Sequence, residues 1–171
     1  WGEPLRYPGR TQHAVQDWRA FPVTGVSFND AVAYAKWLDV SGRLKGAHVC
    51  RDVEWEKAAR GADGRVYTTG RVLRPAEANF APTHGGTDLA LGPDEVGSHH
   101  ESVSPYGIED VHGNAYEMVG SARWNEQAAI LGGDWDREHV QQRLDDRFRQ
   151  EPNSRNAQFG FRICAAFPGH R

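Results

Sequence analysis

The stretch SPYGIEDVHGNAYEM, residues 104–118, places conformationally special residues close together. Two glycines, Gly107 and Gly113, allow backbone φ values that other residues avoid. Two carboxylates, Asp110 and Glu117, flank the second glycine, with amide and aromatic side chains beside them. The stretch predicts a tightly turned segment that gathers oxygen atoms from side chains and from the backbone.

The chain has the composition of one globular domain. Its 171 residues are 39% hydrophobic and 25% charged, which permits a sizeable core and argues against disorder. The formal net charge of −3 argues against nucleic acid as a partner, because phosphate binding needs a basic excess. No apolar run reaches the length of about 18 residues that indicates a membrane span. The chain begins at Trp1 without a methionine, so we expect a fragment of a longer protein.

Two helices are predicted in the first third of the chain. Ser27 and Asp30 have the spacing of a capping box, and Gly42 follows the expected end of that helix. Asp52 is the expected cap of the second helix and Gly61 its expected stop. The predicted buried stripes are Ala31, Tyr34, Ala35 and Leu38 in the first helix, and Trp55, Ala58 and Ala59 in the second.

Strands are predicted at residues 47–50, 128–135 and 159–167. Between residues 66 and 130 glycine and proline recur and no period stands out. This region is predicted to be a series of loops, which a compact domain must hold in place by some means. Helices, short strands and long loops together predict a single α+β domain over residues 1–171.

The two cysteines, Cys50 and Cys164, are too few for a disulfide scaffold. Their small number favours a cytoplasmic protein. We expect both thiols to be reduced and buried, as free cysteines usually are. A single bridge that closes the long intervening loop is the alternative.

The segment from Asp110 to Glu117 is a candidate metal site. Calcium binds six to eight oxygens from carboxylates, amides and backbone carbonyls, and this segment offers that mixture. Its spacing does not match an EF-hand loop. An ordinary turn with solvated carboxylates is therefore the alternative when the residues alone are considered.

Seven pieces of sequence occur in a characteristic order: PVTGVSFNDAVAYAKWL, VEWEKAARGADGR, ANF, VGS, SPYGIEDVHGNAYEMV, LGGDW and GFRICA. Together they resemble the formylglycine-generating enzyme family, also called the sulfatase-modifying-factor family. The resemblance covers roughly residues 20–167, and the family's usual first segment is not recognisable in residues 1–21. It implies a variant of the C-type lectin fold with two helices, short antiparallel strands and long loops.

The resemblance implies two calcium sites, so we expect one or two calcium ions. The second site lies in the stretch quoted above and would use the side chains of Asp110 and Glu117 with the carbonyls of Gly113 and Ala115. The ligands implied for the first site are Asn79, the Phe80 carbonyl, Asp88 and the Ala90 carbonyl.

The resemblance also implies a copper ion held by two cysteines just after the GG[ST][WY]-type motif, because soft sulfur selects Cu(I). Here that motif reads GGDWDREHVQQ, and the two cysteine positions hold Arg137 and Gln142. Neither side chain is a ligand for Cu(I). We therefore expect no copper, no catalytic residue and no formylglycine formation.

Other chemistry-bearing residues have simpler interpretations. The pair His99–His100 follows the VGS piece, has no third ligand at a recognisable spacing and is predicted to be solvated. His112 is predicted to be a surface or packing residue. Glu54 and Glu56 are two positions apart and face different sides of a helix, so they are predicted to be a cap and a surface charge.

The segment 134–158 is a candidate binding surface. Eleven of its 25 residues are Asp, Glu or Arg, and predicted strands flank it. In C-type lectin folds this region faces the ligand, although an ordinary solvated loop is the alternative. The residues expected to bind are Trp135, Arg137, His139, Gln142, Arg147 and Phe148.

We therefore expect a non-catalytic module that binds or senses a protein or a small molecule. The resemblance implies fusion to an effector such as a bacterial kinase or caspase-like protease. Two alternatives stay open. One is a variable protein of a diversity-generating retroelement, and the other is an enzyme of altered, non-copper chemistry with a concave site near Arg137 and Asp146. No nucleic-acid or membrane partner is expected.

Overall fold

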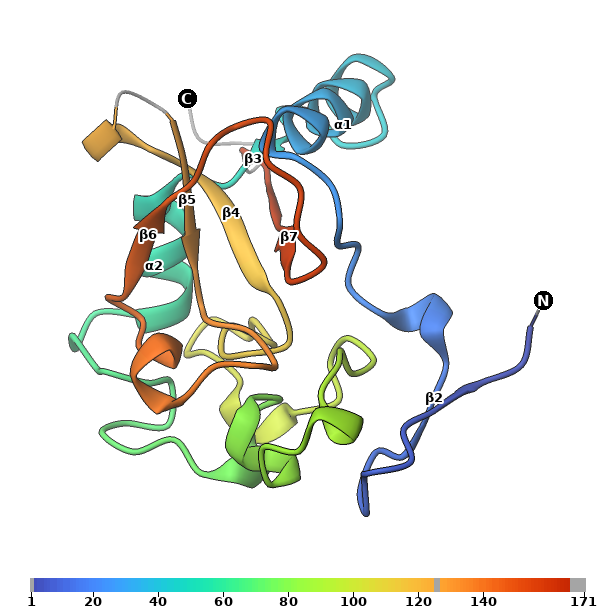
Figure 1. Ribbon diagram of the computed structural model, residues 1–171. Helices are drawn as coiled ribbons and strands as arrows, with labels where there is room; N and C mark the ends of the chain where they lie inside the picture. The colour runs from blue at the N-terminus through green and yellow to red at the C-terminus, as the bar shows by residue number, and fades with distance from the viewer. Residues whose placement is uncertain (1, 125–126, 167–171) are drawn as a thin grey trace.

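A computed structural model describes residues 2–124 and 127–166. These residues form two α-helices, eight short strands and seven 3-10 turns, four of which follow one another between the second helix and the fourth strand (Figure 1). The helices are α1 (Phe28–Val40) and α2 (Asp52–Arg60). The strands are β1 (Leu5–Arg6), β2 (Val15–Gln16), β3 (His48–Val49), β4 (Tyr116–Ser121), β5 (Gln127–Leu131), β6 (Arg147–Arg149), β7 (Phe159–Phe161) and β8 (Ile163–Cys164). The 3-10 turns are η1 (Trp18–Ala20), η2 (Pro75–Glu77), η3 (Ala81–His84), η4 (Asp88–Ala90), η5 (His100–Ser102), η6 (Ala122–Trp124) and η7 (His139–Gln142).

The main sheet has four strands in the order β6-β5-β4-β7. Strand β4 is antiparallel to β5 and parallel to β7, and every residue of β4 is buried. Helix α2 packs beside this sheet, whereas α1 lies near β3 and β7 at one end of the molecule (Figure 1). Two small ladders, β1 with β2 and β3 with β8, complete the strand pairing among the described residues.

Helix α1 begins as its sequence predicts. The Ser27 hydroxyl accepts a hydrogen bond from the Asp30 amide, and the Asp30 carboxylate accepts one from the Ser27 amide at 2.8 Å. This capping box satisfies amide groups that the first helical turn leaves free. Ala31 and Ala35 are buried, but Tyr34 is 46% exposed, so the buried stripe is narrower than predicted.

Helix α2 differs from its prediction at the start. Arg51 is the N-cap residue, and the Glu54 carboxylate accepts its amide hydrogen at 2.9 Å. Asp52 is the first residue of the helix, is buried, and accepts a hydrogen bond from Ser121 Oγ at 2.6 Å. The helix ends at Gly61, where φ is 76°, as predicted for a glycine stop.

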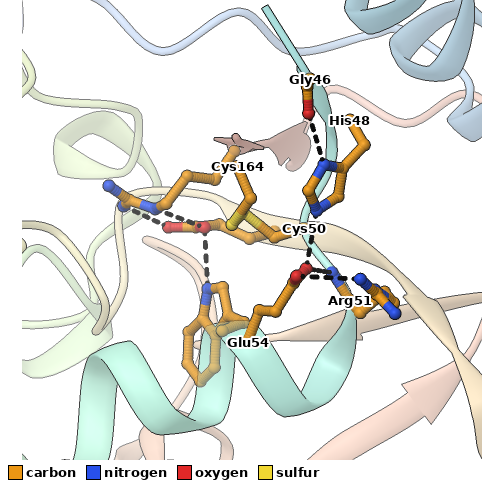
Figure 2. Close-up of a disulfide and its surroundings, with 9 residues drawn as sticks. Gly46, His48, Cys50, Arg51, Glu54 and Cys164 are labelled. Carbon is orange, nitrogen blue, oxygen red and sulfur yellow. Dashed lines mark hydrogen bonds and ion pairs between the residues drawn. A yellow bond between two sulfur atoms is a disulfide. The ribbon is translucent and has the colours of Figure 1, made fainter. Parts of the chain in front are cut away.

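Cys50 and Cys164 form a disulfide, so the expectation of two reduced thiols is wrong. The small β3–β8 ladder brings the two cysteines together across a separation of 114 residues. Figure 2 shows the bridge beside the start of α2, where His48 and Arg51 both contact the Glu54 carboxylate. Sequence spacing carried no sign of this ladder, because each of its strands has only two residues.

The strand predictions missed the centre of the sheet. Strand β4 lies inside the region predicted to be loops, because a strand buried on both faces shows no polar alternation. The strand predicted over 128–135 ends at Leu131, before two glycines that turn the chain. The strand predicted over 159–167 is two short strands, and its last residue lies outside the described residues.

Candidate functional site

The stretch 104–118 bends sharply at two residues that are not glycine. Asp110 and Asn114 have φ values of 56° and 63°, in the left-handed region that few side chains tolerate. Gly113 has a φ of 69°, and a Cβ atom there would lie 2.0 Å from the carbonyl oxygen of Asn79. Only glycine fits this position without moving the backbone. Strained conformations of this kind cluster at functional sites.

Asn114 fastens the stretch to a distant loop. Its Oδ1 atom accepts hydrogen bonds from the Asp94 amide at 2.8 Å and from Asn79 Nδ2 at 3.2 Å. Its Nδ2 atom donates to the Asp94 carbonyl at 3.1 Å. The asparagine therefore joins three segments that lie far apart in the sequence.

Glu117 is the most heavily hydrogen-bonded carboxylate of the stretch. Arg162 donates to both of its oxygens, at 2.8 Å from Nε and 2.6 Å from Nη2. Trp55 Nε1 adds a third hydrogen bond at 2.8 Å. The Glu117 side chain is only 9% exposed, so its carboxylate is largely desolvated.

Asp110 lines a cavity of about 660 Å³ together with Ala115, Glu117 and Arg162. The Asp110 Oδ2 atom accepts a hydrogen bond from the Gly97 amide at 2.6 Å. Burial raises the pKa of Asp110, and the Glu117 charge raises that pKa further. A carboxylate that is desolvated beside a second carboxylate favours a cation in the same space.

The donor atoms at this second site are oxygens, which are the type of ligand that a hard cation such as Ca²⁺ prefers. Asp110, Ala115 and Glu117 line one cavity and carry the oxygen atoms that Ca²⁺ binds, and an ion there would share the Glu117 carboxylate with Arg162 and Trp55. In the described part of the chain, no group of three or more His, Cys, Asp or Glu side chains is arranged to hold a metal ion. Backbone carbonyls would have to complete the site.

The residues implied for the first site are arranged differently. The Ala90 carbonyl accepts a hydrogen bond from Arg10 Nε at 2.6 Å, and the Phe80 carbonyl accepts one from the Thr83 amide at 2.9 Å. Asp88 is exposed, whereas Asn79 is buried. Sequence reasoning missed Arg10, because it lies in the N-terminal residues that carried no recognisable motif.

Arg137 and Gln142, at the two positions implied for copper, have opposite environments. Arg137 has a side chain that is 47% exposed and lies 3.7 Å from the Asp134 carboxylate. Gln142 is fully buried, and its Nε2 atom donates to the carbonyls of Asp134 at 3.1 Å and Arg137 at 3.3 Å. A Cβ atom on Gly133 would lie 2.3 Å from Gln142 Oε1, so the amide fills this space.

The remaining candidate binding residues are only partly at the surface. His139 has a side chain that is 47% exposed, with its ring edge-on to Phe80 at 4.8 Å between centroids. Phe148 is 44% exposed on β6, and Trp135 is half-buried. The Arg147 side chain is only 9% exposed and pairs with Glu56 at 2.5 Å. Among the six candidates, Arg137, His139 and Phe148 are exposed.

His99 differs from its prediction, whereas His112 agrees with its own. His99 is 3% exposed rather than solvated, and its Nε2 atom lies 2.8 Å from the Asp94 carboxylate. His112 is a packing residue: its Nδ1 atom hydrogen-bonds to the Gln142 carbonyl at 2.8 Å, and its Nε2 atom accepts from the Thr68 amide at 2.9 Å. Both histidines became buried because loops that are remote in sequence fold over them.

Asp134 is a further unusual carboxylate that sequence reasoning did not single out. It is fully buried, and its Oδ2 atom has no hydrogen-bond partner within 3.5 Å. Burial raises the pKa of Asp134 to about 6. The GG-x-W motif that contains it was the available signal.

No helix in the described part of the chain is long and apolar enough to cross a membrane.

Comparison with curated proteins finds relatives that are longer than this chain. Inactive C-alpha-formylglycine-generating enzyme 2 of Bos taurus is 29% identical over 178 residues, which cover 96% of this chain and 56% of that protein. Serine/threonine-protein kinase pkn1 of Chlamydia pneumoniae is 28% identical over 178 residues, covering 92% of this chain and 25% of the kinase. The chain thus spans just over half the length of the first of these relatives.

Comparison with solved structures supports the same fold. Treponema denticola variable protein 1 superposes with a TM-score of 0.74 at 16% identity, over 93% of this chain and 76% of that protein. The expected C-type lectin-like α+β fold is thereby confirmed. The profile of the sulfatase-modifying factor enzyme 1-like domain matches residues 2–167, so the match begins earlier than the sequence motifs predicted. The chain belongs to the sulfatase-modifying factor enzyme 1-like domain family.

Proposed function

We propose that this chain is a non-catalytic binding module on a formylglycine-generating-enzyme-like fold. The observation that carries the proposal is the buried amide of Gln142, which is hydrogen-bonded to two backbone carbonyls at a position where the family's chemistry needs a thiolate. Arg137 occupies the other position that needs a thiolate, and both cysteines of the chain form the Cys50–Cys164 disulfide. The similarity to an inactive relative supports the same proposal.

The binding surface that we propose comprises Arg137, His139 and Phe148. These side chains project from loops and from the edge strand β6, which the four-stranded sheet holds rigidly. An arginine, a histidine and an aromatic ring on a rigid support suit recognition of a peptide segment. The fold shared with a variable protein is compatible with such a surface.

A selection experiment tests this surface. A displayed library of random peptides is panned on the purified chain, and enriched peptides are then titrated against the chain with Arg137→Ala and Phe148→Ala combined. We expect at least a tenfold loss of affinity, because two central contacts are removed. Arg71→Ala with Val72→Ala, on another exposed loop, is the matched control and should bind unchanged. Failure to enrich any peptide, or equal affinity for both double variants, overturns the proposal.

A copper titration tests the lack of catalysis independently. Cu(I) is added under reducing conditions with a chromogenic competitor, and we expect no uptake by the wild-type chain. The variant with Arg137→Cys and Gln142→Cys is the positive control, since it restores both thiolates. Uptake of copper by the wild type, or formylglycine formation in a sulfatase-derived peptide, contradicts a non-catalytic role.

We also propose that a calcium ion binds at the second site. Asp110 and Glu117 would hold it through their side chains, and Gly113 and Ala115 through their carbonyls. The bound ion would neutralise the two carboxylates and fasten the stretch 104–118 to the sheet. The 660 Å³ cavity and the raised pKa of Asp110 support this proposal.

The full-length protein would fuse this module to an effector. The similarity to two chlamydial serine/threonine-protein kinases, of which the chain covers only about a quarter, supports such a fusion.

The disulfide weighs against the cytoplasmic compartment expected from the cysteine count, because such bridges persist mainly in oxidising compartments.

An enzyme of altered chemistry is a second candidate, favoured by Asp134. A buried carboxyl group with a pKa of about 6 is suited to general acid–base work near neutral pH. This candidate predicts a product from a small-molecule library incubated with the wild type but not with Asp134→Asn. Retroelement diversification, the remaining alternative, predicts that residues 134–158 differ between copies of the gene while the flanking strands do not.

A further inference from the structure

We propose that the Arg10 guanidinium occupies the place of the first calcium ion implied for this family, so that this chain binds at most one calcium ion. The proposal concerns the N-terminal hairpin of β1 and β2 and the loop of residues 88–99. It does not rest on the proposed binding function, and it holds whether or not the second site binds an ion.

The Arg10 side chain is completely buried and fully engaged. Its Nε atom donates to the Ala90 carbonyl at 2.6 Å, and its Nη2 atom donates to the Gly92 carbonyl at 2.7 Å. Its Nη1 atom forms an ion pair with the Asp94 carboxylate, whose side chain is also 0% exposed. The Tyr7 ring covers the face of the guanidinium at 3.7 Å from its centroid. Oxygen acceptors around its edge and an aromatic ring over its face enclose this guanidinium.

Of the four ligands implied for the first ion, two carbonyls are hydrogen-bonded within the chain and the one carboxylate is exposed. The Ala90 carbonyl points to Arg10 Nε, and the Phe80 carbonyl is occupied by the Thr83 amide. Asp88 is exposed, in contrast to the buried Asp94. Asn79 Oδ1 has no hydrogen-bond partner within 3.5 Å, but Asn79 Nδ2 donates to the Gly92 carbonyl that Arg10 also contacts. A single buried amide oxygen does not make a calcium site.

The electrostatics of the surroundings also exclude a second cation. His84 and His99 lie at the same Asp94 carboxylate, and the His13 ring lies 5.2 Å from the His99 ring between centroids. Burial, and next the Arg10 charge, lower the pKa of His84 to about 4, so this histidine stays neutral beside the guanidinium. A divalent ion at the Ala90 carbonyl would be repelled by the same charge, and Asp94, the buried carboxylate beside it, is already paired with Arg10.

The test is the calcium stoichiometry of the chain after treatment with a chelator, measured by native mass spectrometry and by calorimetric titration with CaCl₂. We expect one ion or none in the wild type. Asp88→Asn should leave the stoichiometry unchanged, because Asp88 is exposed and takes no part in binding. Arg10→Ala should take up one more ion than the wild type, because it frees the carbonyls of Ala90 and Gly92 and the carboxylate of Asp94. Arg6→Ala, an exposed position in the same hairpin, is the matched control.

Two ions bound to the wild type, or loss of an ion on Asp88→Asn, overturns the proposal. If Arg10→Ala does not fold, the wild-type stoichiometry and Asp88→Asn decide the question on their own. Failure of the calcium proposal for the second site can be distinguished from failure of the Arg10 proposal. In that case the wild type binds no ion and Asp110→Asn has no effect on the stoichiometry. That outcome leaves the assignment of Arg10 supported.

Discussion

Two regions of this molecule use arginine beside carboxylate in opposite ways. In the Arg10 region, both partners of the Arg10–Asp94 pair have side chains that are 0% exposed. In the Arg162 region, the Arg162 side chain is 31% exposed, Glu117 is 9% exposed, and the pair opens onto the 660 Å³ cavity that Asp110 lines. The first region is closed around its own cation, whereas the second retains space and a carboxylate for an added one.

The difference shows what makes a cluster of oxygens into an ion site. Both regions contain carboxylates and turned backbone, so residue types do not distinguish them. The deciding feature is how much a guanidinium from elsewhere in the chain leaves free: Arg10 pairs with the buried Asp94, whereas Arg162 pairs with Glu117 and leaves Asp110 facing a cavity. An internal cation is always present and needs no ion from solution, but it leaves the region without a response to calcium.

Removing Arg10 should have the largest effect on stability. Arg10→Ala leaves Asp94 buried without its partner, and breaking a buried ion pair typically costs about 3 to 5 kcal/mol. Urea unfolding followed by tryptophan fluorescence measures the free energy of unfolding. Arg162→Ala should cost less, because Arg162 is partly solvated. Equal losses for the two variants contradict the comparison.

Removing the disulfide should mainly weaken the Arg162 region. Cys50→Ala with Cys164→Ala releases a loop of 114 residues, and loss of a native bridge typically costs about 2 to 5 kcal/mol. Because Arg162 lies two residues before Cys164, amide exchange should rise more in residues 159–164 than in residues 88–99. Hydrogen exchange measured by mass spectrometry would show whether the rise is confined to one region.

Acid should weaken the Arg10 region through His84. The folded-state pKa of about 4 lies below the ordinary value of 6.5, so the unfolded chain binds a proton more readily. The stabilisation is therefore complete above pH 6.5 and is lost as the pH falls towards 4, by at most about 3 kcal/mol. Thermal melts of His84→Gln should show a flatter profile over this range. His139→Gln, at an exposed histidine, should keep the wild-type slope.

Calcium should have the smallest effect and should act only on the Arg162 region. A ligand at 100 times its Kd stabilises the folded state by about 2.7 kcal/mol. A chelator should lower the melting temperature of the wild type accordingly, and Asp110→Asn or Glu117→Gln should blunt the response. Asp88→Asn should melt like the wild type with and without chelator. A chelator that shifts no melting temperature contradicts calcium binding at the second site.

Local sequence predicted the features whose causes are local. The capping box of Ser27 and Asp30 and the stop at Gly61 involve residues within a few positions of one another, and both are confirmed. The ordered motifs predicted the family and the α+β fold, which the profile match and the structural comparison confirm. The replacement of two thiolates by Arg137 and Gln142 can also be read directly from the sequence.

Features that depend on remote segments were not predictable in this way. Strand β4 was missed because it is buried on both faces. The disulfide was only the alternative interpretation, because the two-residue strands that bring its cysteines together leave no pattern to set against the low cysteine count. Burial of His99 and Gln142 depends on loops that close over them. Their environments follow from packing and not from their neighbours in the chain.

The sequence by itself determined the family, the start of α1, the glycine stop of α2, the absence of the copper-binding thiols and the oxygen-rich stretch around Gly113. Only the tertiary structure decided which oxygens remain available to a cation. Arg10 and Asp94 are 84 positions apart, and their pairing depends on the hairpin of β1 and β2 docking against the loop of residues 88–99. Capping acts over a few residues, but desolvation and ion pairing depend on everything that packs within a few ångströms.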